Sequence, residues 1–292
     1  MAGPRTGRRM AWAAAVAAAL AVLPGALSGV PATARPLDDV VASRSLRVIA
    51  YEDNAPFSWI EGGKPRGIDV ELGAALAAKL GVAAEIVLRM PGENVDDDLR
   101  ANIWRGPLTG GGVGDVMLHV PIDRDLSIRN NLVVIGNPYF QEQVALAVDP
   151  ARLGDITTFD VFRSEKVGVQ LGTVADYFLM RYDNGALINN VDHHLRPHQG
   201  IERFIAKQTA GIMGVRSAIE AMLFERRATA RWVDLPTPGI VRKSWLVGMA
   251  VSEKSRDLQY ALGAALKDLR QSGELDRICA RYGITYTPPP DP

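Results

Sequence analysis

An alternation of strand-like and helix-like segments between residues 46 and 120 limits the possible folds more than any other feature of the sequence. Residues 46–51 and 84–88 have the apolar pattern of buried strands. Between them, apolar residues fall four positions apart, as on one face of a helix, at Ile68, Leu72, Leu76 and Leu80. A second helical pattern over residues 95–105 leads into a third strand that begins at Val116. Because parallel strands need crossover connections, this order predicts an α/β fold with a parallel sheet.

The alternation restarts after Val148 and predicts a second lobe. Strand patterns over residues 166–170 and 210–215 alternate with helical patterns over residues 173–181, 201–207 and 218–227. The apolar strand over residues 245–251 is then expected to return to the first lobe, where two amphipathic helices follow. We therefore predict lobe 1 over residues 46–146 and 244–285, lobe 2 over residues 147–243, and a tail over residues 286–292.

The first 34 residues have the pattern of an export signal. Three arginines precede an apolar run from Ala11 to Leu23, and an Ala-x-Ala cleavage pattern ends at Ala34. An uncleaved membrane anchor is the alternative, but a run of about 13 residues is short for a bilayer. The sequence thus predicts a periplasmic protein that is not integral to the membrane.

The composition of the mature chain argues against some classes of partner. Without the signal it keeps 30 basic and 33 acidic residues, so we expect no broad positive surface for nucleic acid or anionic lipid. Cys279 is the only cysteine, which excludes an intrachain disulfide, and its place on an apolar helical face predicts a buried side chain. We expect a monomer without a cofactor.

Polar residues follow the apolar strand that begins at Val116. His119 lies at the end of this strand, and the turn after it holds Arg124 and Arg129. Polar side chains at the carboxyl ends of strands lie at the sheet edge where open α/β folds bind ligands. The segment from Asp115 to Val148 is therefore the first place to expect a binding site.

Four segments together resemble the bacterial extracellular solute-binding proteins of family 3, the periplasmic receptors of polar amino-acid transporters. They are Pro56-Phe57 with residues 67–72, Arg129 nine residues before Pro138-Tyr139, residues 167–173, and residues 269–283. The resemblance implies a type II periplasmic binding protein fold, with two α/β lobes, a ligand cleft and two hinge crossings. Residues 144–148 and 245–251 are the predicted crossings, and an ABC permease is the implied partner.

The resemblance also implies an anion site. In the family, an arginine at the position of Arg129 binds the α-carboxylate of the ligand, and the turn at Gly172 and Thr173 offers backbone N–H groups to the same anion. A guanidinium matches a carboxylate with a planar fork of donors, and a helix N-terminus favours an anion. The alternatives are a solvated surface arginine and an ordinary helix cap.

Three positions depart from the family pattern. Asn54 stands where the family stacks an aromatic residue on the ligand, and His119 stands where the family has small hydroxyl residues. The aspartate that binds the ligand amine is missing after residues 210–215, where Arg216 would repel an ammonium group. An ordinary α-amino acid is thus a doubtful ligand. The predicted ligand-binding residues are Asn54, Phe57, His119, Arg129, Gly172 and Thr173.

These departures are similar to one subgroup, the J-type binding proteins that accompany periplasmic quinoprotein methanol dehydrogenases, whose cofactor is pyrroloquinoline quinone (PQQ). The similarity lies in residues 54–58, in Asp115-Val116 with Val120-Pro121, and in the strand that ends at Gly214. It implies a PQQ-dependent dehydrogenase as partner, in place of a transporter or besides one.

Other groups of residues have two interpretations each. Glu52, Asp53, His119 and Asp123 either hold a cation or line the cleft rim, and we expect the rim. Two of the three histidines at positions 193, 194 and 198 have a zinc-pair spacing, but Pro197 argues against a shared helix, so we expect surface histidines. Trp59, Trp104 and Tyr139 either form a docking patch or belong to the core.

The sequence contains no G-x-S-x-G, P-loop or H-E-x-x-H motif. We therefore predict a protein without enzymatic activity that captures a small polar, carboxylate-bearing ligand for an ABC transporter. The alternative is an accessory protein of a periplasmic PQQ-dependent dehydrogenase with a reshaped cleft.

Overall fold

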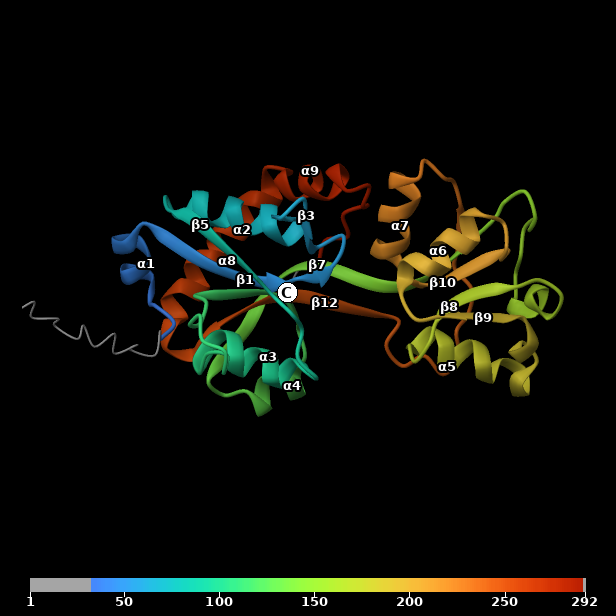
Figure 1. Cartoon of the computed structure of the whole chain (residues 1–292), viewed down its shortest axis with the longest axis horizontal. Coiled ribbons are helices and arrows are strands. Elements are labelled where there is room, and N and C mark those ends of the chain that lie inside the picture. The colour runs from blue at the N-terminus through green and yellow to red at the C-terminus, as the bar shows by residue number, and fades with distance from the viewer. Residues whose placement is uncertain (1–32, 291–292) are drawn as a thin grey trace, which may run out of the picture. The chain divides into compact units, whose positions relative to one another are not determined.

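The computed structural model describes residues 33–290 (Figure 1). Most of the predicted export signal therefore lies outside the described residues. Within them, no helix is both long and apolar enough to cross a membrane. The strands of the main sheet are β1 (Ser45–Tyr51), β5 (Ala83–Arg89), β6 (Val116–Pro121), β7 (Val133–Val148), β8 (Val167–Gln170), β9 (Val191–His194), β10 (Gly211–Val215), β11 (Arg231–Val233) and β12 (Ser244–Ser252).

The main sheet runs through both lobes in the order β5-β1-β6-β12-β7-β10-β8-β9, with β11 paired to β7. Strands β1, β5 and β6 are parallel in lobe 1, and β8, β9 and β10 are parallel in lobe 2. A small antiparallel sheet in lobe 1 consists of β2 (Asp53–Asn54), β3 (Ser58–Glu61) and β4 (Lys64–Arg66). The predicted two-lobed α/β fold is confirmed.

One strand, β7, belongs to both lobes, as Figure 1 shows. It pairs with β12 as far as Gln143, and from Val144 onward it pairs with β10. Its 16 residues would extend over about 50 Å at the usual rise of a strand. Strand β12 begins at Ser244, opposite Gln143, so the chain changes lobes within β7 and again just before β12. The predicted division after residues 146 and 243 remains an interpretation of the sequence.

Helices cover both faces of the sheet in lobe 1. Neighbouring residues alternate between faces: Val48 packs with Leu72, whereas Ile49 packs with Ile103. Burial on both faces explains why the parallel strands are apolar throughout. The helices are α1 (Leu37–Ser43), α2 (Ile68–Lys79), α3 (Val95–Leu99), α4 (Arg124–Arg129), α8 (Arg256–Gln271) and α9 (Glu274–Arg281), and α3 continues as the π-helical turn η1 (Arg100–Trp104).

Lobe 2 has the same layered arrangement. Met213 packs with Val169 on one face of the sheet, and Ile212 packs with Phe204 on the other. Its α-helices are α5 (Val174–Arg181), α6 (Pro197–Ile205) and α7 (Arg216–Glu225). The short 3₁₀ helices of the chain are η2 (Phe159–Arg163), η3 (Tyr182–Gly185), η4 (Ile188–Asn190) and η5 (Glu253–Ser255). Helix α6 begins earlier than the predicted residue 201, because the fixed φ of Pro197 suits the first helical position.

The C-terminal residues bond to both lobes. The N–H of Gln141 donates to the carbonyl of Thr287 at 2.9 Å, and the N–H of Thr285 donates to Glu220 of α7 at 2.9 Å. A guanidinium N–H of Arg270 donates to the carbonyl of Pro289 at 3.2 Å. The segment predicted as a tail therefore bonds to β7 at Thr287 and to α8 at Pro289.

The single cysteine offers a test of the lobe 1 core. Cys279 is 1% exposed, and burial raises the pKa of its thiol from 9.0 to about 12. The unfolded thiol loses its proton at lower pH than the folded one, so the free energy of unfolding should fall as pH rises above about 9, by at most about 1.4 kcal/mol per pH unit. Denaturant titrations at pH 8 and pH 10.5 should show a smaller fall for Cys279→Ala than for the wild type. Rapid labelling of the native thiol by a disulfide reagent at pH 8 would contradict the expected burial.

Candidate binding site between the lobes

Side chains that follow the strands of one lobe contact side chains of the other. Asp53, two residues after β1, lies 3.1 Å from the guanidinium of Arg196, which precedes α6. Asp123, which follows β6, accepts a hydrogen bond of 2.6 Å from Arg242, which precedes β12. Both pairs involve exposed arginines, so they contribute little stability. The first pair shows that the carboxyl ends of β1 and β9 face the same region, and the second places the end of β6 beside the start of β12. We define this region as the candidate site.

Lobe 1 contributes three predicted site residues that lie close together. The N–H of Phe57 donates to the carbonyl of Asn54 at 2.8 Å, which closes one turn. The ring centroids of Phe57 and His119 are 4.4 Å apart. The side-chain amide nitrogen of Asn54 is buried and has no hydrogen-bond partner within residues 33–290. A turn after β2 and the end of β6 thus form one wall of the candidate site.

His119 is held from behind by Asp69 and Tyr139, which the sequence analysis did not assign to the site. Its backbone has a φ of 61°, a left-handed conformation that is uncommon outside glycine and that redirects the side chain at the end of β6. Nδ1 of its imidazole lies 3.2 Å from Oδ2 of Asp69. The hydroxyl of Tyr139 donates to Oδ1 of Asp69 at 2.6 Å and accepts from the backbone N–H of His119 at 3.0 Å.

Asp69 and Tyr139 were both visible in the sequence. Asp69 directly follows Ile68 in the first turn of α2, where the N-terminal N–H groups stabilise a carboxylate even without a basic partner. Tyr139 is 1% exposed, which places it in the core and not in a docking patch. Burial is the main cause that raises the pKa of the Tyr139 hydroxyl well above its ordinary value, and the adjacent Asp69 carboxylate raises it further. The group therefore remains a hydrogen-bond donor.

Arg129 lies in the last turn of α4, and its side chain is 57% exposed. Its guanidinium donates to both carboxylate oxygens of Asp96, at 3.2 and 3.3 Å. These bonds and a third from Asn130 lower the pKa of Asp96, so its carboxylate stays charged. The predicted carboxylate clamp therefore already holds a carboxylate of the protein, an arrangement that favours the alternative of a solvated surface arginine.

Gly172 and Thr173 form the start of α5. The hydroxyl of Thr173 accepts from the N–H of Asp176, and the N–H of Gly172 donates to Oδ2 of Asp176 at 2.8 Å. The other oxygen of Asp176 lies 2.9 Å from Nε2 of His193. A protein carboxylate thus takes the N–H expected to bind an anion, and the geometry is that of an ordinary helix cap. Within the described residues, no hydrogen bond joins this turn to Arg129.

Two ionisable side chains lie at the base of the site, where β7 crosses into lobe 2. Glu142 of β7 is 3% exposed, and its carboxylate accepts hydrogen bonds from the hydroxyl of Ser217 and, at 2.9 Å, from the N–H of Gln143. Burial raises the pKa of Glu142, although these hydrogen bonds act in the opposite direction. Arg216 donates to Glu220 at 2.8 Å and lies 5.0 Å from the ring centroid of Trp232, so its charge is already compensated.

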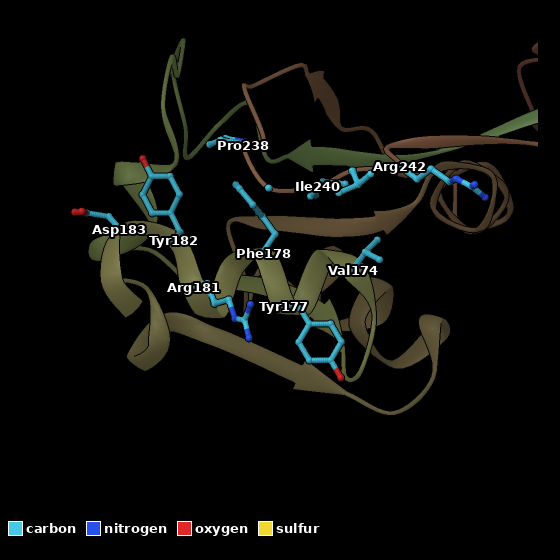
Figure 2. A pocket seen from close by; sticks show the side chains of 11 residues that line it. Val174, Tyr177, Phe178, Arg181, Tyr182, Asp183, Pro238, Ile240 and Arg242 are labelled. Carbon is cyan, nitrogen blue, oxygen red and sulfur yellow. The ribbon is translucent and has the colours of Figure 1, made fainter.

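A cavity of about 700 Å³ lies in lobe 2 between α5 and residues 238–242 (Figure 2). Its lining is mainly apolar, and Figure 2 shows the Phe178 side chain pointing from α5 toward the segment that follows Pro238. Val174 and Arg242 line one end, and Tyr182 lines the other. Because Val174 follows Thr173 and Arg242 contacts Asp123, the first end borders the candidate site.

The remaining predicted groups are dispersed. Asp53 and Asp123 each pair with an arginine, and residues 33–290 contain no group of three or more His, Cys, Asp or Glu side chains placed to hold a metal ion. His193 and His194 lie in β9 and His198 in α6, so no two of them share a helix. The expectation of three surface histidines is wrong for His194, which is 5% exposed because Gly200 of α6 packs against its ring.

The comparisons with known proteins agree with this architecture. Residues 46–104 match the model of one family, the bacterial extracellular solute-binding proteins, family 3. The matched segment includes Asn54, Phe57 and Asp69. No curated protein sequence matches the chain.

Solved structures match nearly the whole described chain. An ancestral cationic amino acid solute binding protein, AncCDT-1, is 20% identical, with a TM-score of 0.66, and the match covers 85% of this chain and 99% of that chain. A second structure of AncCDT-1, described as an ancestral amino acid-binding protein and a precursor of cyclohexadienyl dehydratase, has a TM-score of 0.54, 20% identity, and coverage of 85% and 98%. An amino acid ABC transporter substrate-binding protein from Streptococcus pneumoniae, bound to L-arginine, has a TM-score of 0.56, 16% identity, and coverage of 86% and 99%. The chain therefore has the two-lobed fold of type II periplasmic binding proteins, as predicted.

The buried carboxyl of Glu142 gives a test of the base of the site. An unfolded glutamate loses its proton at lower pH than one whose pKa is raised, so ionisation of Glu142 weakens the fold as pH rises above the unfolded value. Glu142→Gln keeps a hydrogen-bond acceptor for Ser217 and removes this effect. We expect a higher melting temperature than the wild type at pH 8 and a smaller gain, or none, at pH 4.5.

The control for this prediction is Glu225→Gln at the exposed end of α7, which should change little at either pH. A melting temperature of Glu142→Gln below that of the wild type at pH 8 would show that the ionised carboxylate stabilises the contact with Ser217.

Proposed function

We propose that this protein is a periplasmic solute-binding protein of the amino-acid transporter type, which captures a small polar ligand between its lobes for an ABC importer. The main support is that residues after the strands of lobe 1 contact residues of lobe 2 at one site, where Asp53 pairs with Arg196 and Asp123 with Arg242. A ligand enclosed there would contact both lobes and favour their closed arrangement. The family match over residues 46–104 and the transporter proteins among the structural neighbours support the same function.

The proposal includes the location and the partners of the protein. The predicted export signal over residues 1–34 and the extracellular family of the matched segment support a periplasmic location. The physiological partner would be an ABC permease, and the protein would act as a monomer. We propose binding without catalysis, since the neighbours are mostly described as transporter binding proteins, although AncCDT-1 is also described as a dehydratase precursor.

We also propose that the ligand carries a carboxylate. Arg129, Gly172 and Thr173 have the donors for such a group, and each set already serves a protein carboxylate. A ligand carboxylate would have to replace Asp96 on Arg129 or Asp176 on Gly172. This competition costs affinity, because the released carboxylate must be solvated again.

The alternative is an accessory role for a periplasmic PQQ-dependent dehydrogenase. The observation that favours it is the same occupation of both predicted anion donors by Asp96 and Asp176. Because protein carboxylates already accept the hydrogen bonds of these donors, no ligand carboxylate is required to pair with them. Trp104, which is 38% exposed, is then a candidate for contact with the partner protein.

A thermal-shift screen of the mature protein separates these functions. The panel includes amino acids, small carboxylic acids, amines, sugars, PQQ, calcium and lanthanide ions. A ligand at 100 times its Kd should stabilise the native state by about 2.7 kcal/mol. We expect a carboxylate compound to shift the wild type and Arg124→Ala, a control on the same helix, but not Arg129→Ala. If no small molecule shifts the wild type, the transport function is wrong, and association with a quinoprotein dehydrogenase becomes the next measurement.

The competition between ligand and Asp96 can be tested separately. Asp96→Asn removes the carboxylate that occupies Arg129, so the affinity for the carboxylate compound should rise, by about two- to fivefold for the release of an exposed ion pair. Asp97→Asn, in the same helix, is the matched control and should leave the affinity unchanged. Calorimetric titration gives both dissociation constants. A weaker affinity in Asp96→Asn would mean that Asp96 positions Arg129 for the ligand.

A further inference from the structure

The imidazole of His119 is arranged as a fixed hydrogen-bond acceptor. Asp69, which is fully buried, lies behind it, with Oδ2 at 3.2 Å from Nδ1 and Oδ1 bonded to the hydroxyl of Tyr139. The backbone N–H of His119 donates to the same hydroxyl, so the main chain and the ring are held at two points. A left-handed backbone at this position would not persist without such support.

The position of the imidazole proton follows from the neighbours of Nδ1. This nitrogen and Oδ2 of Asp69 are both buried, and within residues 33–290 neither has another polar partner. An unprotonated Nδ1 would present its lone pair to a carboxylate, which is repulsive, so the neutral ring carries its proton on Nδ1, although the contact is not a linear hydrogen bond. Nε2 then has a free lone pair.

Nε2 is the nitrogen available to a ligand. The ring is 19% exposed, and Nε2, unlike Nδ1, is neither enclosed nor bonded to any described residue. His193 is the opposite case in the same chain, because its Nε2 lies 2.9 Å from a carboxylate oxygen of Asp176. The two imidazoles are therefore a matched pair, one with a free Nε2 and one with an occupied Nε2.

The surroundings of His119 favour a donor that carries positive charge. The Phe57 ring lies at 4.4 Å, and the Tyr51 ring meets the imidazole edge-on at 6.5 Å. Asp69 of α2 and Glu142 of β7 are the acidic groups nearby, and the polar contacts of both are to uncharged groups or to the imidazole, not to arginine or lysine. Tyr51 of β1 and Tyr139 of β7 are the other titratable groups that face the ring.

We propose that His119 is a specificity-determining residue of the candidate site, whose Nε2 accepts a hydrogen bond from an ammonium or guanidinium group of the ligand, with Asp69 and Tyr139 as its positioning residues. This inference rests on the proposed function. It gives the site a recognition group for a positively charged nitrogen in lobe 1, whereas the end of β10 in lobe 2 presents Arg216. The ligand class is a small cationic or zwitterionic nitrogen compound.

Two simple ions test the proposal without a known ligand. The protein is labelled with ¹⁵N-histidine, and long-range ¹H–¹⁵N spectra are recorded at pH 8.5, where an ordinary imidazole is neutral. Methylammonium chloride or sodium acetate is then added in equal steps to about 100 mM. We expect the His119 signals to show the Nδ1–H tautomer, and Nε2 to shift with methylammonium but not with acetate. The Nε2 signal of His193, which a carboxylate already occupies, should respond to neither ion.

Variants of the positioning residues extend this test. Asp69→Asn should weaken the response of Nε2 to methylammonium by about tenfold, because the charge that fixes the proton on Nδ1 is gone. Tyr139→Phe keeps that carboxylate and should retain the Nδ1–H tautomer. If Asp69→Asn does not fold, the wild-type comparison of the two ions and Tyr139→Phe still decide the proposal.

The outcomes that overturn the inference are distinct from those that overturn the proposed function. A response of Nε2 to acetate alone, to neither ion, or an Nε2–H tautomer would show that His119 does not accept a bond from a cation. The thermal-shift screen has a different readout, so it can return a ligand when the His119 test fails. A positive His119 test with no ligand in the screen would keep the recognition group and reject the transport function.

Discussion

The pairing of β7 with two different partners is the constraint on which the rest of the structure depends. Its hydrogen bonds to β12 belong to lobe 1, and its hydrogen bonds to β10 belong to lobe 2. Because one continuous strand passes through both lobes, side chains only three residues apart serve different parts of the site. Tyr139 holds Asp69 behind His119, and Glu142 contacts the first turn of α7. The geometry of the site is thus fixed at its base.

The charges of the candidate site are distributed unevenly. The cationic donors that could hold an anion are satisfied by the protein itself: Arg129 by Asp96, and Arg216 by Glu220. The buried carboxylates Asp69 and Glu142 have no arginine or lysine partner in the part of the chain that the structure describes. A positive group of a ligand would therefore compete with fewer charged groups of the protein than a negative group would. The same difference explains why Arg129 is a poor candidate for binding a ligand carboxylate and why His119 is a candidate for binding a positive group.

Much of the fold was predictable because hydrophobic periodicity is a local signal. The four-residue spacing that begins at Ile68 became α2, and its apolar residues are buried against β1. A helix lies within residues 95–105, as predicted, but α3 continues there as a π-helical turn, which periodicity does not distinguish from an α-helix. The site was less predictable. Phe57 and His119 were expected and lie together, but the residues that hold His119 come from α2 and β7, far away in sequence.

The sequence by itself determined the order of strands and helices, the two lobes and the polar residues at the strand ends, because these depend on side-chain patterns within short segments. Only the tertiary structure decided which charges are free. Arg129 meets Asp96 across 33 residues, and His119 meets Asp69 across 50. Such pairs form between loops and helix ends whose approach depends on packing of the whole lobe, and no local pattern encodes that approach. For this reason the fold follows from the sequence, while the chemistry of the site follows from the contacts behind His119 and Arg129.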